Sequence, residues 1–233
     1  MAHQLFKYKH FESEIILVCV HWYLKYPLSY RMLVEMKRER GLVITHTTIM
    51  RWVHQYAPIL DEKVRKHLKP NNDSWRLDET YLKIKGKNVY LYRAVDSEGN
   101  TIDFLLSENR DKVAAKKFFK KALQAQHNQQ PRVITIDQYA ATEIAIHETI
   151  YAGTLSPGTS IRKTKYLNNI IEQDHWFIKR KTRPMLGFGN FKTAEKTISG
   201  IEIMNMIRKG QVEEIRCVLC EVHFLNKIMG VAA

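Results

Sequence analysis

Three acidic residues, each in a different kind of segment, are the clearest candidates for chemistry in this chain. Asp78 lies inside WRLDETY, Asp137 follows the apolar run VITI, and Glu172 lies in KYLNNIIEQDHWFIKRK, 35 positions after Asp137. Carboxylate oxygens are the ligands that Mg²⁺ prefers, and a pair of such ions can stabilise both the entering and the leaving oxygen of a phosphodiester displacement. A single Asp or Glu is more often a solvated surface residue, so a two-metal site is predicted only if all three acids converge.

The charge of the chain indicates a polyanionic partner. The 233 residues carry a net charge of +13, which favours nucleic acid or an acidic membrane surface. Residues 1–70 hold 12 Lys or Arg against 6 Asp or Glu, residues 71–159 hold 12 against 11, and residues 160–210 hold 11 against 4. No apolar run approaches the length of a membrane span, about 20 residues, and the N-terminus is too polar for a signal peptide. We therefore expect a soluble, cytoplasmic protein that binds nucleic acid and no membrane.

The N-terminal region has a helical pattern without the alternation of strands. The apolar spacing predicts three helices: one over residues 12–25, one that follows Ser29 and runs to about residue 40, and one over residues 47–56. Ser29 can cap the second helix, Thr45 or His46 can cap the third, and Pro58 is expected to end it. Two helices joined by a short turn that contains glycine are the helix-turn-helix arrangement, so we predict an all-α helix-turn-helix domain.

The third predicted helix has an apolar face and a polar face. Ile49, Val53 and Tyr56 share the apolar face. The opposite side carries five side chains that can reach base edges or phosphates from the major groove: Thr47, Thr48, Arg51, His54 and Gln55. The alternative is a plain three-helix bundle whose polar face meets only solvent, and the local excess of positive charge favours DNA binding.

From Ser74 onward the pattern is that of a mixed α+β domain. Strands are predicted over residues 75–86, 89–96, 101–106, 133–137 and 159–164, and helices over 112–126, 142–150 and 168–181. The resulting order, β-β-β-α-β-α-β-α, is that of a ribonuclease-H-like α/β core. Asp78 lies within the first strand and Asp137 ends the fourth, where α/β sheets usually place their sites. Glu172 points away from the apolar face of the last helix, whereas Asp174 falls within that face and is not expected to bind metal.

At these residues the chain resembles a known family. WRLDETYLKIKGK, the Asp-containing VITID and KYLNNIIEQDHWFIKRK are similar to the catalytic segments of bacterial insertion-sequence transposases of the insertion-sequence-six family. LSYRMLVEMKRERGLVITHTTIMRWVHQYAP resembles the helix-turn-helix of that family, and the similarity covers roughly residues 6–210. The chain departs from the family pattern at Trp176, where a basic residue is usual; an indole can stack on a base instead of contacting a phosphate.

The resemblance implies an Asp-Asp-Glu (DDE) enzyme in which Asp78, Asp137 and Glu172 hold two Mg²⁺ ions, or Mn²⁺ in their place. Lys179 and Arg180 would contact DNA phosphates. Such an enzyme cleaves double-stranded DNA at the terminal inverted repeats of its element and joins the 3′ ends to target DNA, replicatively and through cointegrates. It would act as a homodimer or a larger synaptic complex in the bacterial cytoplasm, associated with the nucleoid.

The expected domains are a helix-turn-helix domain (1–60), a linker (61–73), the catalytic core (74–185) and a C-terminal helical segment (186–233). Two other functions fit the same pattern. A non-catalytic DNA-binding regulator would use the second domain only to dimerise, and a ribonuclease-H-fold nuclease or junction resolvase would cut without joining. Metal-dependent cleavage and joining of DNA separate the three.

The cysteines predict little. Cys19, Cys217 and Cys220 give no disulfide framework and suit a reducing compartment. Cys217, Cys220 and His223 could suggest zinc, but a single C-x-x-C without a second pair is a weak signal, and packing positions on a helix are the simpler interpretation.

Overall fold

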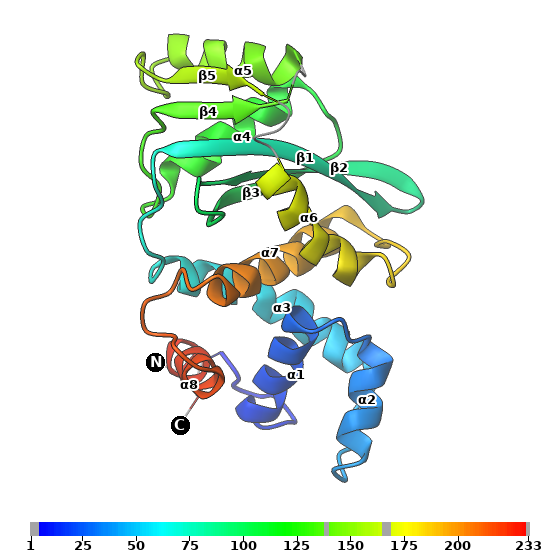
Figure 1. The fold of residues 1–233 in the computed structure, drawn as a ribbon. Coiled ribbons are helices and arrows are strands. Elements are labelled where there is room, and N and C mark those ends of the chain that lie inside the picture. Colours follow the sequence, from blue (N-terminus) through cyan, green and yellow to red (C-terminus); the bar gives the residue numbers. More distant parts are fainter. Residues whose placement is uncertain (1–4, 138–139, 165–168, 232–233) are drawn as a thin grey trace. The chain divides into compact units, whose positions relative to one another are not determined.

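The computed structural model describes residues 5–137, 140–164 and 169–231. These residues form two compact units (Figure 1). The first contains the chain up to Leu68 and from Arg183 onward, and the second contains Lys69–Thr182. The two segments expected at the ends of the chain, 1–60 and 186–233, thus both contribute helices to the first unit. No helix in the described parts of the chain is both long enough and apolar enough to cross a membrane.

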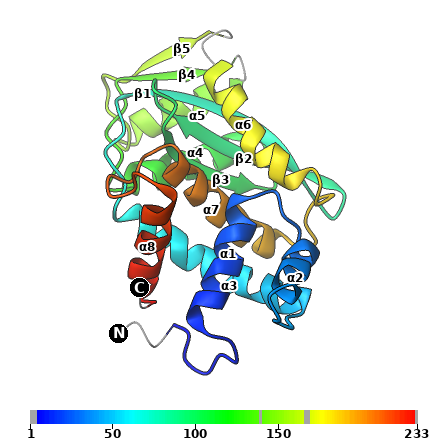
Figure 2. The ribbon, with the colours of Figure 1, turned by 60° about the horizontal axis from the view of Figure 1, so that its bottom comes forward.

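In its described residues the first unit is mainly helical and is built around one long helix (Figure 2). Its helices are α1 (Ser13–Lys25), α2 (Tyr30–Arg38), α3 (His46–Arg65), α7 (Phe191–Arg208) and α8 (Val218–Met229). The central helix α3 contacts α1, α2, α7 and α8. Its predicted apolar residues Ile49, Val53 and Tyr56 are all buried, so the 3.6-residue period correctly identified the face that packs.

The helix starts follow the expected capping chemistry. The Ser29 hydroxyl accepts a hydrogen bond from the Met32 backbone N–H at 3.1 Å, and the Thr45 hydroxyl accepts one from Thr48 N–H at 3.2 Å. Each satisfies a backbone donor that has no partner within the helix. The two predicted caps, Ser29 and Thr45, are confirmed.

The predicted end of the third helix at Pro58 was wrong, because α3 continues to Arg65. Proline has no N–H, so one intrahelical hydrogen bond is lost at this position. Ala57, Leu60 and Val64 are nevertheless buried on the same side of the helix. Their burial offsets the cost of the proline, and the first five residues of the expected linker belong to this helix.

Helix α7 approaches α3 and α1 closely at Gly200. A Cβ atom added there would lie 2.7 Å from Ala57 Cβ and 2.7 Å from the Leu24 methyl groups. Both contacts are shorter than side chains tolerate, so glycine is needed to let these helices pack at this distance.

The second unit has the predicted element order and a five-stranded sheet. Its elements are β1 (Ser74–Ile84), β2 (Lys87–Val95), β3 (Thr101–Ser107), α4 (Lys112–Gln124), β4 (Val133–Ile136), α5 (Ala140–Tyr151), β5 (Ser160–Lys163) and α6 (Asn169–Thr182). The strand order is β3-β2-β1-β4-β5, with β1, β2 and β3 antiparallel and β1, β4 and β5 parallel. This is the ribonuclease-H-like fold, and the predicted fold class is confirmed.

The side of β1 that is buried changes where the acids lie. Trp75 and Leu77 are buried in the first half of the strand, whereas Thr80 and Leu82 are buried in the second half. The first pair packs in the core with α4 and α5, and α6 contacts β1 and β2 within the same unit (Figure 1). Because successive side chains alternate between the two faces of a strand, Asp78 and Glu79 serve different layers.

Some individual packing predictions were wrong. In α4, Phe118 and Phe119 are both buried, whereas Val113 at the first turn is 53% exposed. Cys217 and Cys220 are not packing residues: they form a disulfide at the start of α8, where the Cys217 side chain caps the helix. The spacing C-x-x-C places both sulfurs on the first turn of a helix, close enough to bond.

Candidate active site

Two of the three predicted acids meet at the centre of the sheet. In the parallel pairing of β1 with β4, Arg76 lies opposite Thr135, and continuing that register by two residues brings Asp78 beside Asp137. One carboxylate oxygen from each of Asp78, Glu79 and Asp137 lies within 4.8 Å of the others. The fold therefore converts residues 59 positions apart in the sequence into neighbours on adjacent strands.

Glu79 was not anticipated as part of this group. Its side chain is only 3% exposed and accepts hydrogen bonds from Arg110 (2.9 Å) and from the Thr142 hydroxyl (3.2 Å). Burial raises the pKa of Glu79, the Arg110 guanidinium opposes this, and the charges of Asp137 and Asp78 raise it further. Since both carboxylate oxygens already have donors, Glu79 is better suited to hold Arg110 and α5 in place than to bind a cation.

Arg110 connects the buried acid to the second predicted catalytic acid. Its Nη2 atom lies 2.9 Å from Glu79 Oε2 and 3.2 Å from Asp137 Oδ2. The Arg110 guanidinium therefore places a positive charge between two carboxylates, which reduces the repulsion between them. The Asp137 side chain is 40% exposed, so it can still be reached from solvent.

Asp78 is held from the opposite face of the sheet by helix α6. His175 Nε2 lies 3.0 Å from Asp78 Oδ2, and the Arg93 Nη1 atom lies 3.2 Å from His175 Nδ1. Arg93 also donates to Asp174 at 2.7 Å, which supplies the polar partner that the sequence did not reveal for this acid. Burial lowers the pKa of His175 and Arg93 acts in the same direction, while the hydrogen bond to Asp78 opposes the shift.

The third predicted acid, Glu172, lies on α6 but outside the compact carboxylate group. It is exposed, and with Asn169, Gln173 and Trp176 it lines an open hollow along the helix. Among the described residues, the group within 4.8 Å contains Asp78, Glu79 and Asp137 and does not include Glu172. Glu172 precedes His175, which contacts Asp78, by three residues, about one helical turn. Asn168, expected at the start of this helix, lies outside the described residues.

The basic residues of α6 differ in accessibility. Lys179 is half-buried, Arg180 is exposed, and the Arg180 guanidinium lies 5.3 Å from the centre of the exposed Trp176 ring. Lys181 is buried, which lowers its pKa to about 7, so the basic run after Lys179 is not a uniformly solvated helix end. Lys179 and Arg180 remain predicted DNA contacts.

On α3, none of the five predicted DNA-contacting residues is buried. Thr47, Arg51 and Gln55 are exposed, and Thr48 and His54 are half-buried. Burial, followed by the charge of Lys196, lowers the pKa of His54. The apolar spacing thus separated the accessible face from the packed one, while DNA contact at these positions stays a prediction.

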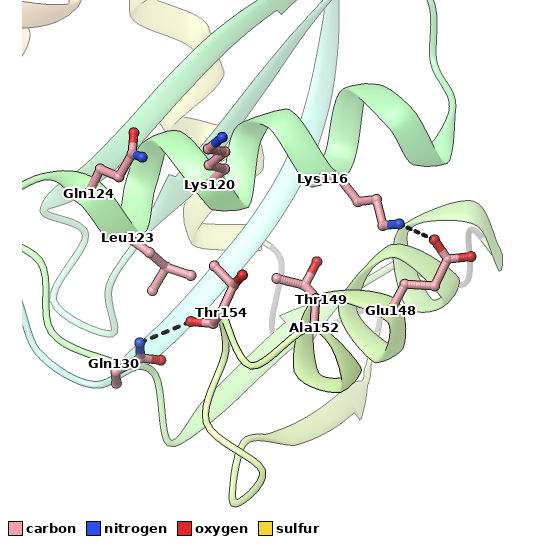
Figure 3. A pocket seen from close by; sticks show the side chains of 9 residues that line it. All are labelled: Lys116, Lys120, Leu123, Gln124, Gln130, Glu148, Thr149, Ala152 and Thr154. Atoms are coloured by element: carbon pink, nitrogen blue, oxygen red, sulfur yellow. Dashed lines mark hydrogen bonds and ion pairs between the residues drawn. The ribbon is translucent and has the colours of Figure 1, made fainter.

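A second hollow lies between α4 and α5 (Figure 3). Glu148, the carboxylate in its described lining, forms ion pairs with Lys112 at 3.2 Å and with Lys116. On its other side Gln130 donates to the Thr154 carbonyl at 3.1 Å. This lining offers one paired acid instead of a group, so it is no alternative metal site.

The acids on β1 and β4 fit a divalent cation. Asp78 and Asp137 supply hard oxygen donors from adjacent strands, which is the chemistry that Mg²⁺ and Mn²⁺ prefer. Within the described part of the chain, His175 is the one side chain that hydrogen-bonds the Asp78 carboxylate, and it contacts a single oxygen. The donor set therefore matches a metal-dependent enzyme built on a ribonuclease-H-like sheet.

Comparison with known proteins defines the class. A family described as a DDE domain matches residues 72–211. The solved structure of the HTLV-2 integrase catalytic core domain in complex with magnesium (trimeric form) is similar with a TM-score of 0.44 and 16% identity, over 57% of this chain and 84% of that chain. The family match, which covers more than half of the chain, shows by itself that the protein is a DDE-domain enzyme.

Curated relatives identify the family within that class. The transposase for the insertion-sequence-like element IS431mec and the transposase for insertion sequence element IS257 in transposon Tn4003, both of Staphylococcus aureus, are each 45% identical over 205 residues. The match covers 88% of this chain and 88% of each relative. The chain belongs to the insertion-sequence-six family of bacterial transposases, and it is a metal-dependent DNA transposase.

Proposed function

We propose that this transposase cleaves DNA at the terminal inverted repeats of its insertion sequence and joins the 3′ ends to target DNA, by the replicative, cointegrate-forming route. Asp78, Asp137 and Glu172 are the proposed catalytic and metal-binding residues. The observation that carries the proposal is the convergence of Asp78 and Asp137 on adjacent strands of a ribonuclease-H-like sheet.

Two Mg²⁺ ions, or Mn²⁺ in their place, would stabilise the charge on the entering and leaving oxygens of the phosphodiester. Asp78 and Asp137 provide the oxygen donors and the negative charge that would hold them. Arg110 and His175 each tie one oxygen of these acids, which fixes their orientation before substrate arrives.

The assignment of Glu172 as the third acid is supported by its position on α6. The helix is attached to the sheet by Arg93, which donates to Asp174, and by His175, which contacts Asp78. Residues three apart on a helix have Cβ atoms about 5–6 Å apart, so Glu172 neighbours the residue that contacts Asp78. Its exposure agrees with a carboxylate that is ordered by cations and DNA.

We propose two DNA-contacting surfaces. The accessible side of α3, with Arg51 at its centre, would read the terminal repeat from the major groove. On α6, Lys179 and Arg180 would contact phosphates near the reacting bond, and Trp176 would stack on a base. Because two ends must be joined together, we expect a homodimer or a larger synaptic complex on DNA.

The experiment combines purified protein, a labelled terminal-repeat duplex, a target plasmid, and Mg²⁺ or EDTA. Strand joining is expected in Mg²⁺ and should be lost in Asp78→Asn, Asp137→Asn and Glu172→Gln while repeat binding is retained. Glu195→Gln is the matched control, because Glu195 is an exposed acid on α7. Binding without cleavage would instead identify a regulator, and cleavage without joining would identify a nuclease or junction resolvase.

A further inference from the structure

Asp78 and Arg93 are directly opposite each other in the antiparallel pair β1–β2. Opposite residues on one face of such a pair have Cβ atoms about 5 Å apart, so a direct ion pair between them would be the ordinary outcome. Among the described contacts, Arg93 instead donates to Asp174 and faces His175, and it is His175 that contacts Asp78. His175 thus takes the contact with Asp78 that the opposite residue, Arg93, could have made as an ion pair.

The hydrogen bonds assign the proton on this histidine. Arginine carries only donors, so the His175 Nδ1 atom that faces Arg93 Nη1 at 3.2 Å must be an acceptor without a proton. The remaining nitrogen, Nε2, then carries the proton and donates to Asp78 Oδ2 at 3.0 Å. Arg93 and His175 are both almost completely buried, which restricts the rotation of either side chain.

We propose that Arg93 and His175 act as a positioning pair that ties Asp78 Oδ2 with a neutral donor and thereby keeps the charge and the other oxygen of Asp78 available to a divalent cation. This inference rests on the proposed function, since it concerns the metal that function requires. A neutral donor orients the Asp78 carboxylate without adding positive charge next to the position that the cation would take.

The same pair connects the two strands to the helix that carries Glu172. Arg93 lies on β2, Asp78 on β1, and both reach α6 through Asp174 and His175. Because these two α6 residues follow Glu172 by two and three positions, the contacts that orient Asp78 also fix the segment of α6 that presents Glu172. One buried arginine thus positions two of the three proposed ligands.

A matched pair of substitutions separates this role from packing. In His175→Gln the side-chain amide reaches the place of Nε2 and keeps an N–H for Asp78, whereas in His175→Asn it reaches only the place of Nδ1 and keeps an acceptor for Arg93. Mn²⁺ binding to the full chain is measured by electron paramagnetic resonance, together with thermal unfolding. We expect His175→Asn to bind Mn²⁺ at least about 10-fold more weakly and His175→Gln to stay within about 3-fold of the wild type.

The assigned proton is tested on the wild-type protein, where folding is not in question. The ¹⁵N shifts of the His175 ring, identified by its absence in His175→Gln, should show Nε2 protonated and Nδ1 not. A proton on Nδ1, wild-type Mn²⁺ affinity in His175→Asn, or equal weakening in both variants would each overturn the inference.

Failure of the proposed function has a different signature. A wild-type protein that binds Mn²⁺ with the expected variant pattern but joins no DNA would refute strand transfer and leave the positioning pair intact. A wild-type protein that binds no Mn²⁺ would refute both.

Discussion

A histidine–carboxylate hydrogen bond occurs in each unit, and the two have different surroundings. In the helical unit, His21 Nε2 lies 2.7 Å from Glu221 Oε1, and Lys25 Nζ lies 2.7 Å from the other oxygen. In the ribonuclease-H-like unit, His175 contacts one oxygen of Asp78. The Glu221 side chain is 7% exposed and that of Asp78 is 16% exposed.

The difference lies in how many oxygens of the acid already have a donor. Glu221 has one donor on each oxygen and one is a cation, so its charge is compensated and it connects α1 to α8. Asp78 has one neutral donor and retains the capacity to bind a cation. The same pair of residue types thus connects two helices in one unit, and under the proposed function it would orient a metal ligand in the other.

The largest effect is expected at the His175–Asp78 pair. Asp78→Asn keeps the size of the side chain and a hydrogen-bond acceptor but removes the charge that would hold a cation. Strand joining should fall by at least about 1,000-fold, as for groups that an active site cannot replace. Thermal unfolding should be unchanged or occur at a slightly higher temperature, because active-site charges often reduce stability. A large loss of stability in Asp78→Asn would contradict the view that Glu221, and not Asp78, contributes to stability.

At the His21–Glu221 pair, a substitution should reduce stability and leave strand joining intact. Glu221→Ala leaves His21 and Lys25 without their shared acceptor, and breaking a buried ion pair on one side costs about 3–5 kcal/mol. Urea unfolding should report a loss of about 3 kcal/mol in the free energy of unfolding, with joining retained at temperatures where the variant is folded. Glu213→Ala, an exposed acid in the same unit, is the control.

A substitution of Arg110 tests whether the cationic partner of Asp137 orients its acid as His175 orients Asp78. Arg110→Gln removes the charge that bridges Glu79 and Asp137, so Asp137 becomes less well oriented and the buried Glu79 loses its compensating cation. We expect joining to fall about 10- to 100-fold. Arg132→Gln, at an exposed pair with Asp73, should have no effect on joining. Unchanged joining in Arg110→Gln would show that Arg110 is dispensable for orienting Asp137.

The smallest effect is expected from Lys25→Met, which gives Glu221 a single donor, as Asp78 has. Burial alone would raise the pKa of Glu221, but hydrogen bonds from His21 and Lys25 outweigh it and lower the pKa below its ordinary value of 4.5. The stability that this group contributes is therefore present above pH 4.5 and lost as the pH falls through the lowered pKa. Lys25→Met should cost about 1 kcal/mol at pH 7, and the difference from wild type should shrink in urea unfolding below pH 4. A constant difference would show that Lys25 acts through packing.

The order of the elements and the two aspartates could be predicted because their signals are local. Alternation of apolar residues, the turn residues between strands, and the end of the run VITI fix where Asp78 and Asp137 fall on β1 and β4. Once the element order is that of a ribonuclease-H-like sheet, the parallel pairing of β1 and β4 makes those acids neighbours.

The partners of the acids could not be predicted, because they come from distant segments. Nothing in the sequence near Glu79 indicates that Arg110 and Thr142 will take both of its oxygens, and nothing near Asp174 indicates Arg93. The end of α3 was misplaced for the same kind of reason: local propensity at Pro58 was outweighed by packing that only the tertiary structure supplies.

The switch in buried face along β1 makes the strand intolerant of insertion. A residue added between Trp75 and Asp78 would move each following side chain to the other face of the strand. The Asp78 carboxylate would then enter the layer now occupied by Glu79. The Lys85-Gly86 turn at the far end of the strand carries no such constraint. Lengthening that hairpin should leave DNA joining intact, whereas one extra residue upstream should abolish it.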